Sequence, residues 1–248
     1  MSFSSFFRCG SSAWSSPSED GSVRMGSAKV FLYDNVDSDR CVLVFPDIEG
    51  VDSDRTKENC IKLSALYKVV LVVLDLANDF PPRQKTKPWF GWLDQLRPLA
   101  ETYKTIQWLQ QRSFESMRPL FDDVVAYMQQ QHDVVKFAVL GFSWGSIFAA
   151  KYCSIPGLPI VCGVLVSPSW FVEKTSYFIG PEDKMGQQVL VPQLVLCSGE
   201  ELSRFEPGKE VETDLKSRPF ASEVRQFPDM PSGWVNHGDL TDPQVARG

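Results

Sequence analysis

Two kinds of hydrophobic pattern alternate along the chain. Short apolar runs, which are typical of buried strands, occur at residues 29–33, 41–45, 69–74, 137–140, 161–166, 190–197 and 223–227. Segments with apolar residues at helical spacing lie between them, at residues 54–66, 101–111 and 118–131, and a run of small residues starts at Ser146. Strands that alternate with helices predict a mostly parallel sheet with helices on both faces. Right-handed crossovers then bring the carboxyl ends of the strands, and any site they carry, to one edge.

The chain is long enough for one α/β domain with a large core. It has 248 residues, of which 43% are hydrophobic and 23% charged, as in an ordinary soluble protein. We expect a single domain over residues 28–248, preceded by a flexible Ser/Gly-rich tail at residues 1–27. An organellar transit peptide is the alternative for this tail, since no acidic residue precedes Glu19.

Composition and motifs narrow the class of protein further. A net charge of −6 without a basic stripe argues against nucleic-acid binding, and no apolar run approaches the length of a membrane span. There is no metal-ligand cluster and no phosphate-binding or dinucleotide-binding loop, so we expect no metal and no cofactor. The six cysteines form no CxxC pair, which favours buried thiols in a reducing, cytoplasmic compartment over the alternative of a disulfide framework.

The strongest motif is GFSWG at residues 141–145, between a predicted strand and a predicted helix. This Gly-x-Ser-x-Gly pattern is typical of a nucleophile elbow, in which a sharp turn holds the central serine in a strained conformation at the carboxyl edge of the sheet. The turn is so tight that a Cβ atom two residues before or after the serine would collide with its surroundings. A plain glycine-rich turn is the simpler alternative.

Four segments resemble the dienelactone hydrolase family. They are LVFPDIEG at 43–50, residues 114–124 leading into the elbow, QLVLCSGEE at 193–201, and MPSGWVNHGDLTDP at 230–243. The resemblance spans about residues 29–245. Residues 114–124 and the elbow are similar to the eukaryotic branch of the family, whose elbow usually carries Cys in place of Ser. It implies an α/β-hydrolase fold and an activity on carboxylic esters or lactones.

The resemblance also implies roles for individual residues. Ser143 occupies the position of the nucleophile, and Glu201 that of the triad acid, with Glu200 as the alternative. The backbone N–H groups of Ile48 and Trp144 would hold the oxyanion, where each donor lowers the barrier by roughly 3–4 kcal/mol.

Two of these assignments have simpler alternatives. Asp47 matches the family's acidic residue after the first strand, which in the Cys enzymes helps to gate the thiolate, but it could instead cap a helix. Glu200 and Glu201 could be a solvated pair in a loop.

The triad base is where the sequence departs from the family. The chain has two histidines, and His132 precedes the elbow strand, at the end of the sheet opposite the nucleophile. In the family the last loop reads His-Gly-Trp, two residues, then Arg-Gly-Asp. Ungapped alignment on residues 233–234 and 238–239 puts Ser232 in the histidine's place and His237 in that of the arginine. A hydroxyl is no base near pH 7, so catalysis would require the loop to turn His237 toward the nucleophile.

The end of the sequence is a second departure. The family continues past the position of Gly248 into a final helix that packs on the sheet. We therefore expect either a truncated sequence or an apolar face that a partner covers.

Three functions remain open at this point. The first is a degenerate hydrolase that serves in binding or as a structural part of an assembly, whose partners would cover the N-terminal tail and the C-terminal end. The second is an active ester or lactone hydrolase with His237 as an irregular base. The third is a small-ligand-binding protein without turnover, whose pocket would be lined by aromatic residues at positions 89, 90, 92, 144, 170 and 234.

Overall fold

The computed structural model describes residues 21–74, 111–169, 185–199, 205–237, 239–243 and 245. Several predicted features fall outside these ranges: the acid positions Glu200 and Glu201, most of the helix at 101–111, and the aromatic residues Trp89, Phe90, Trp92 and Trp170. Among the described helices, none is long and apolar enough to cross a membrane.

The described part of the chain is built on one eight-stranded sheet with the order β1-β2-β4-β3-β5-β6-β7-β8. The strands are β1 Val23–Met25, β2 Ala28–Tyr33, β3 Arg40–Phe45, β4 Lys68–Val72, β5 Lys136–Phe142, β6 Ile160–Val166, β7 Gln193–Ser198 and β8 Glu223–Phe227. Strands β3 to β8 run parallel, and β1 and β2 add an antiparallel edge. The mostly parallel sheet predicted from the sequence is therefore confirmed.

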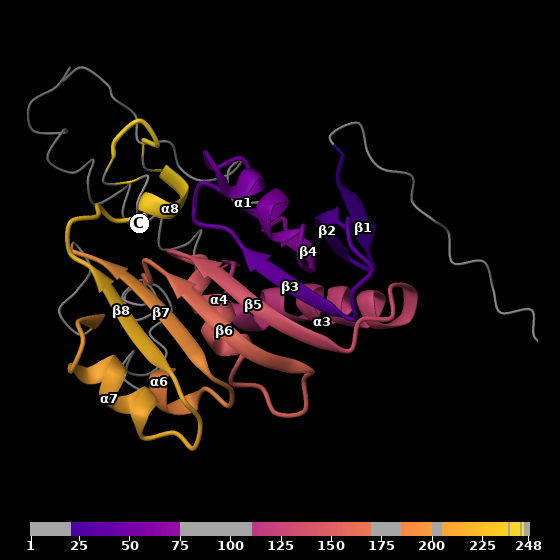
Figure 1. Ribbon diagram of the computed structural model, residues 1–248. Coiled ribbons are helices and arrows are strands. Elements are labelled where there is room, and N and C mark those ends of the chain that lie inside the picture. The colour runs from indigo at the N-terminus through magenta and orange to yellow at the C-terminus, as the bar shows by residue number, and fades with distance from the viewer. Residues whose placement is uncertain are drawn as a thin grey trace, which may run out of the picture.

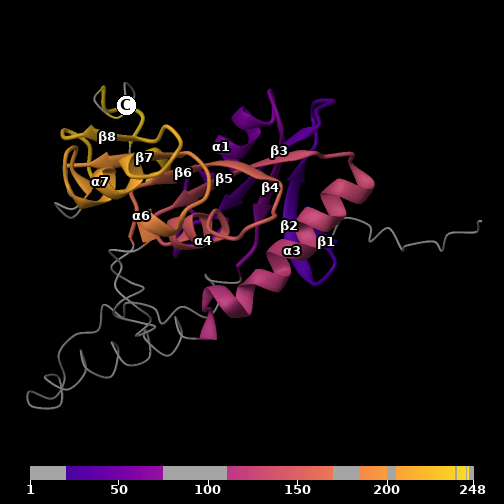
Figure 2. The same ribbon diagram turned by 90° about the horizontal axis from the view of Figure 1, so that it is seen from below.

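Helices lie on both sides of this sheet. They are α1 Thr56–Leu63, α3 Phe114–Gln131, α4 Gly145–Tyr152, α6 Met185–Gln188, α7 Glu210–Lys216 and α8 Trp234–His237. Figure 2 shows α3, α4 and α6 on one face and α1 on the other. Figure 1 shows α8 beyond the carboxyl ends of the central strands.

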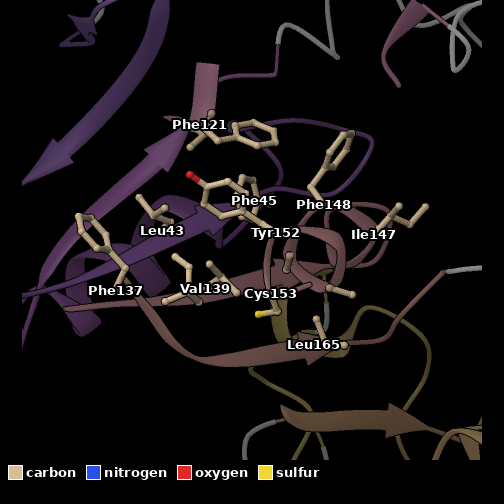
Figure 3. Close-up of a cluster of buried hydrophobic side chains, with 14 of the residues drawn as sticks. Leu43, Phe45, Phe121, Phe137, Val139, Ile147, Phe148, Tyr152, Cys153 and Leu165 are labelled. Atoms are coloured by element: carbon tan, nitrogen blue, oxygen red, sulfur yellow. The ribbon is translucent and has the colours of Figure 1, made fainter. Parts of the chain in front are cut away.

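The main core fills the space between the sheet and helices α3 and α4 (Figure 3). Phe45 of β3 contacts Phe121 of α3 with 4.8 Å between ring centroids, and Phe121 contacts Phe148 of α4 at 5.8 Å. All three rings are almost completely buried, which stabilises the fold by roughly 2–3 kcal/mol for each side chain. This packing holds α4, the helix that follows the GFSWG motif, against β3 and β5.

The structure corrects two predicted boundaries. The sheet begins at Val23, inside the segment predicted to be a flexible tail, because β1 pairs with β2 over Val23–Met25. Helix α3 begins at Phe114, four residues before the predicted start, because the side chain of Ser113 accepts a hydrogen bond from the Ser116 N–H and caps the helix.

Candidate active site

The turn between β5 and α4 has the geometry of a nucleophile elbow. Ser143 adopts a φ of +46°, a left-handed conformation that is strained for a residue with a side chain. A Cβ atom on Gly141 would lie 2.6 Å from the Gly145 carbonyl oxygen, and one on Gly145 would collide with the carbonyl oxygens of Phe45 and Pro46. The glycines are therefore required where the motif predicted them, and the loop after β3 packs directly on the start of α4.

The hydroxyl of Ser143 contacts another hydroxyl. Its Oγ lies 2.9 Å from Oγ of Ser169, and the Ser169 N–H donates to the Ser143 carbonyl at 3.3 Å. Sequence reasoning missed Ser169, although it lies just after β6, the strand beside β5, where a residue at the carboxyl edge should approach the elbow. Within the described ranges, no hydrogen bond joins Ser143 to His237.

The predicted nucleophile and the two residues considered for the position of its base line one cavity. A cavity of about 170 Å³ at the carboxyl edge of the sheet is lined by Ser143, Ser232 and His237, together with Asp47, Ile48 and Ser167. The residue at the expected histidine position and the only nearby histidine of the sequence thus both reach the nucleophile's cavity. Ile48 contributes to the wall, as expected of an oxyanion donor, but its role stays a prediction.

The two tryptophans that the structure describes belong to the core. Trp144 is 1% exposed and contacts Phe148 with 4.6 Å between ring centroids, while Trp234 is 2% exposed beside Phe227. Neither lines the cavity. The aromatic ligand pocket stays a prediction, because its other members, at positions 89, 90, 92 and 170, lie outside the described residues. The backbone of Trp144, at the start of α4, keeps its predicted place next to Ser143.

His237 is held between carboxylates. Its Nε2 lies 2.9 Å from Oδ2 of Asp47, and its Nδ1 lies 3.1 Å from Oδ2 of Asp54. A neutral imidazole carries one N–H, and an ionised carboxylate can only accept hydrogen bonds. Carboxylate oxygens at both ring nitrogens therefore favour the doubly protonated imidazolium, in which both nitrogens donate and neither can take a proton from a serine.

The charge around His237 favours the same protonation state. Partial burial lowers the pKa of the imidazole, but the hydrogen bond that it donates to Asp54 and the charge of Asp47 outweigh this effect. Glu49 adds a third carboxylate, 4.0 Å from Nδ1. The net effect raises the pKa of His237 above its ordinary value of 6.5.

Asp47 is a buried junction between two loops. Besides His237, its carboxylate accepts hydrogen bonds from the Glu49 N–H at 2.9 Å, the Ser53 hydroxyl at 2.7 Å and the Asn236 amide at 3.3 Å. The simpler prediction that Asp47 caps a helix is wrong, because the N-cap position of α1 is Arg55. The carboxylate instead ties the loop after β3 to α8.

Long-range backbone contacts set the position of His237. The Arg55 guanidinium donates to the carbonyls of Trp234 and Val235, and the Arg55 N–H donates to the Asn236 carbonyl at 3.2 Å. Asn59 of α1 adds a side-chain hydrogen bond to the Val235 carbonyl at 3.2 Å. These hydrogen bonds fix the backbone carbonyls of the short helix α8, and its last residue, His237, faces Asp47.

His132 lies where the sequence predicted. It follows α3 and precedes β5, so it is at the amino end of the strand whose carboxyl end carries Ser143. Its Nδ1 lies 2.8 Å from Oδ2 of Asp34, whose other oxygen accepts from the buried Lys68 ammonium at 3.0 Å. This histidine is part of a structural ion cluster.

Comparison with known structures supports the fold. A protein assigned as a dienelactone hydrolase from Klebsiella pneumoniae superimposes with a TM-score of 0.53 at 13% identity, covering 89% of this chain and 90% of its own. Est1E from Butyrivibrio proteoclasticus, solved with ferulic acid bound, gives 0.54 at 10% identity over 91% of this chain and 96% of its own. An α/β serine hydrolase homologue from Coxiella burnetii gives 0.51 at 11% identity over 95% and 96%.

These likenesses establish the fold alone, because the sequence identities are so low. The chain adopts the α/β-hydrolase fold, with dienelactone hydrolases and esterases among its structural neighbours. No protein-family model matches the sequence, and no curated protein sequence does so either. The link to the eukaryotic branch of the dienelactone hydrolase family stays a prediction.

The elbow makes a prediction about stability. We expect Gly145→Ala to lower the free energy of unfolding by about 3 kcal/mol or more, because its Cβ would strike backbone carbonyls that cannot move aside. Gly157→Ala is the control, since Gly157 has a φ of +81° in open space and should lose only about 1–2 kcal/mol from backbone strain. Urea unfolding of both variants is the measurement, and equal losses would contradict the tight turn.

The carboxylates around His237 make a second prediction. Because its folded pKa is raised, His237 should stabilise the protein most below about pH 6.5 and lose that contribution as pH rises through the folded pKa. The difference in stability between wild type and His237→Gln should therefore shrink between pH 6 and pH 8. NMR titration of the imidazole should show a lower pKa in Asp54→Asn.

Asp39→Asn is the matched control for that titration. Asp39 and Asp54 have similarly exposed side chains, 62% and 63%, but Asp39 makes no contact with His237. An imidazole titration that is the same in wild type and Asp54→Asn would contradict the proposed ion pairing.

Proposed function

We propose that this chain is a catalytically degenerate, dienelactone-hydrolase-like protein that serves in binding or as a structural part of an assembly. The observation that carries the proposal is the clamping of both His237 ring nitrogens by Asp47 and Asp54. The only histidine near the nucleophile is thus committed to carboxylates, and Ser143 contacts a hydroxyl in its place.

The chemistry of the remaining groups supports this proposal. A serine hydroxyl becomes an effective nucleophile only when a base takes its proton. Ser169 and Ser232 carry hydroxyls of the same basicity as Ser143, so neither can do this near neutral pH. Loss of a triad base typically lowers the rate by roughly 10⁴-fold to 10⁶-fold, leaving binding and oxyanion stabilisation. What remains here is a shaped cavity in which, among the described residues, neither the His237 imidazole nor a carboxylate is hydrogen-bonded to the Ser143 hydroxyl.

An active hydrolase of carboxylic esters or lactones is the second candidate, favoured by the shared cavity of Ser143 and His237. His237 would have to lose its second proton and turn Nε2 from Asp47 to Ser143, while Nδ1 kept its hydrogen bond to Asp54 or passed to Glu201. Ser143 would then give its proton to Nε2 and attack the substrate carbonyl, with the Ile48 and Trp144 N–H groups donating to the oxyanion. The bond to the alcohol oxygen would break, the alcohol would take the proton from His237, and the acyl group would stay on Ser143.

A third candidate is a small-ligand-binding protein without turnover. The strained elbow and the cavity of about 170 Å³ would hold a small ester or lactone, and the absence of a base would leave it unchanged.

Hydrolysis of p-nitrophenyl acetate separates these candidates. We expect wild type and Ser143→Ala to release p-nitrophenol at the same rate, because the serine has no base. Ser232→His should raise the rate, since it restores an imidazole at the position that the family alignment assigns to the base. Mass spectrometry of an acyl adduct on Ser143 gives a second readout of any gain.

The opposite outcome would reject the proposal. A rate in wild type that falls at least about 100-fold in both Ser143→Ala and His237→Gln would establish a working pair of nucleophile and base. Ser154→Ala is the control, because its hydroxyl bonds the Ala150 carbonyl at the end of α4, away from the cavity.

A further inference from the structure

The two faces of the sheet are covered unequally. Helices α3 and α4 pack on one face over the main core. On the other face α1 packs on β4, and among the elements that the structure describes no helix lies over β5 and β6 (Figures 1 and 2). The side chains that β5 and β6 present there are apolar but only partly buried: Ala138, Leu140, Cys162 and Val164.

A groove of about 540 Å³ lies on this face, formed by residues of the described strands and of α1 and the turn after it. Leu63 of α1 and Tyr67 form one wall, and Leu140, Val161 and Val164 contribute to the floor. It shares no lining residue with the cavity at Ser143, which lies at the carboxyl edge of the sheet. The groove is therefore a separate feature of the fold.

Exposed apolar side chains continue the surface beyond the groove. Val161 in its lining is 44% exposed, and Val135 and Leu66, each next in sequence to a lining residue, are 59% and 66% exposed. Strands of a parallel sheet are normally covered on both faces, and helices are the elements that cover them. An amphipathic helix presents an apolar stripe of the kind that such a sheet face buries.

Charge at one end of the groove specifies the partner further. Arg40 of β3 and Lys136 of β5 are register partners at the amino ends of their strands, and both line the groove. No carboxylate is among the described lining residues. Arg40 has a partner outside the lining, Asp39 at 3.7 Å, in an exposed pair that water screens. Two adjacent cations over an apolar floor favour a partner with an apolar stripe that ends in carboxylates.

We propose that this groove binds an amphipathic α-helix of a partner protein, with its apolar stripe on β5 and β6 and its carboxylates at Arg40 and Lys136. The inference deepens the proposed binding role, on which it rests, by naming the surface and the chemistry of the partner. A second copy of this chain fits less well, because the same face would bring two more cations and no lining carboxylate to the contact.

A pair of synthetic peptides tests the charge of the partner. Both peptides are 18-residue helices with leucines at i, i+3, i+4 and i+7 spacing along one face. They differ only in the last turn, where one peptide carries two Glu residues and the other two Lys residues. Fluorescence anisotropy should show the full-length protein binding the Glu peptide about tenfold more tightly than the Lys peptide. The variant Arg40→Glu/Lys136→Glu should reverse that preference, and added salt should reduce it.

A matched pair of surface variants tests the apolar floor. Val161→Lys places a charge in the groove, and Leu190→Lys places one at a site of similar exposure, 41%, outside it. We expect Val161→Lys to weaken binding of the Glu peptide at least about tenfold and Leu190→Lys to leave it unchanged. Thermal unfolding of both variants checks that each remains folded.

Several outcomes would overturn the proposal. The first is that wild type does not bind the Glu peptide, and the second is that Val161→Lys and Leu190→Lys weaken its binding equally. The third is that light scattering shows self-association of wild type that Val161→Lys abolishes. Displacement of a fluorescent fatty acid by dodecanoate, without peptide binding, would assign the groove to a long-chain carboxylate. Esterase activity reports on Ser143 alone, so an active enzyme that also binds the Glu peptide would reject only the degenerate hydrolase.

Discussion

The site depends on one arrangement of charge, an imidazole clamped between two carboxylates. Asp47 is almost fully buried, and an ionised carboxylate in that position needs donors, which it receives from His237, Ser53 and two neighbouring amides. The His237 side chain is 33% exposed, so water screens its side of the contact, whereas the buried carboxylate of Asp47 would lose one of its donors if the imidazole were removed. The one histidine that lines the cavity of Ser143 is thus held by Asp47 and Asp54, and the proposed loss of catalysis rests on these contacts.

The same contacts show that the geometry of the elbow does not depend on catalysis. The strain at Ser143 is maintained by close backbone packing between Gly145 and the loop after β3, and that loop is in turn fastened to α8 through Asp47. None of these contacts involves the Ser143 hydroxyl. The turn therefore contributes to the packing of α4 on β3 whether or not a substrate is ever attacked, and its geometry alone does not identify an active enzyme.

Local patterns predicted most of the fold. The strand at 223–227 was placed with the bounds of β8, and the glycines at 141 and 145 were required for the stated steric reason. The site was predicted less well, because its partners come from distant segments: Ser169 reaches the elbow from the next strand, and His237 meets Asp54 across 183 positions. The direction of the His237 ring could not be predicted from the alignment, because it depends on contacts of α8 with Arg55 and of the ring with Asp47 and Asp54.

The groove and the cavity at Ser143 are formed by different parts of the same strands. Arg40 and Lys136 begin β3 and β5 and line the groove, whereas Asp47 and Ser143 follow the carboxyl ends of those strands and line the cavity. The main core packs against α3 and α4, around Phe45 and Phe121, and gives both strands a closely packed support. The groove and the cavity share no lining residue, so a substitution of Ser143 leaves the lining of the groove unchanged. The binding proposed for the groove therefore does not depend on whether Ser143 is a nucleophile, because the cover of a parallel sheet is a requirement of packing and not of catalysis.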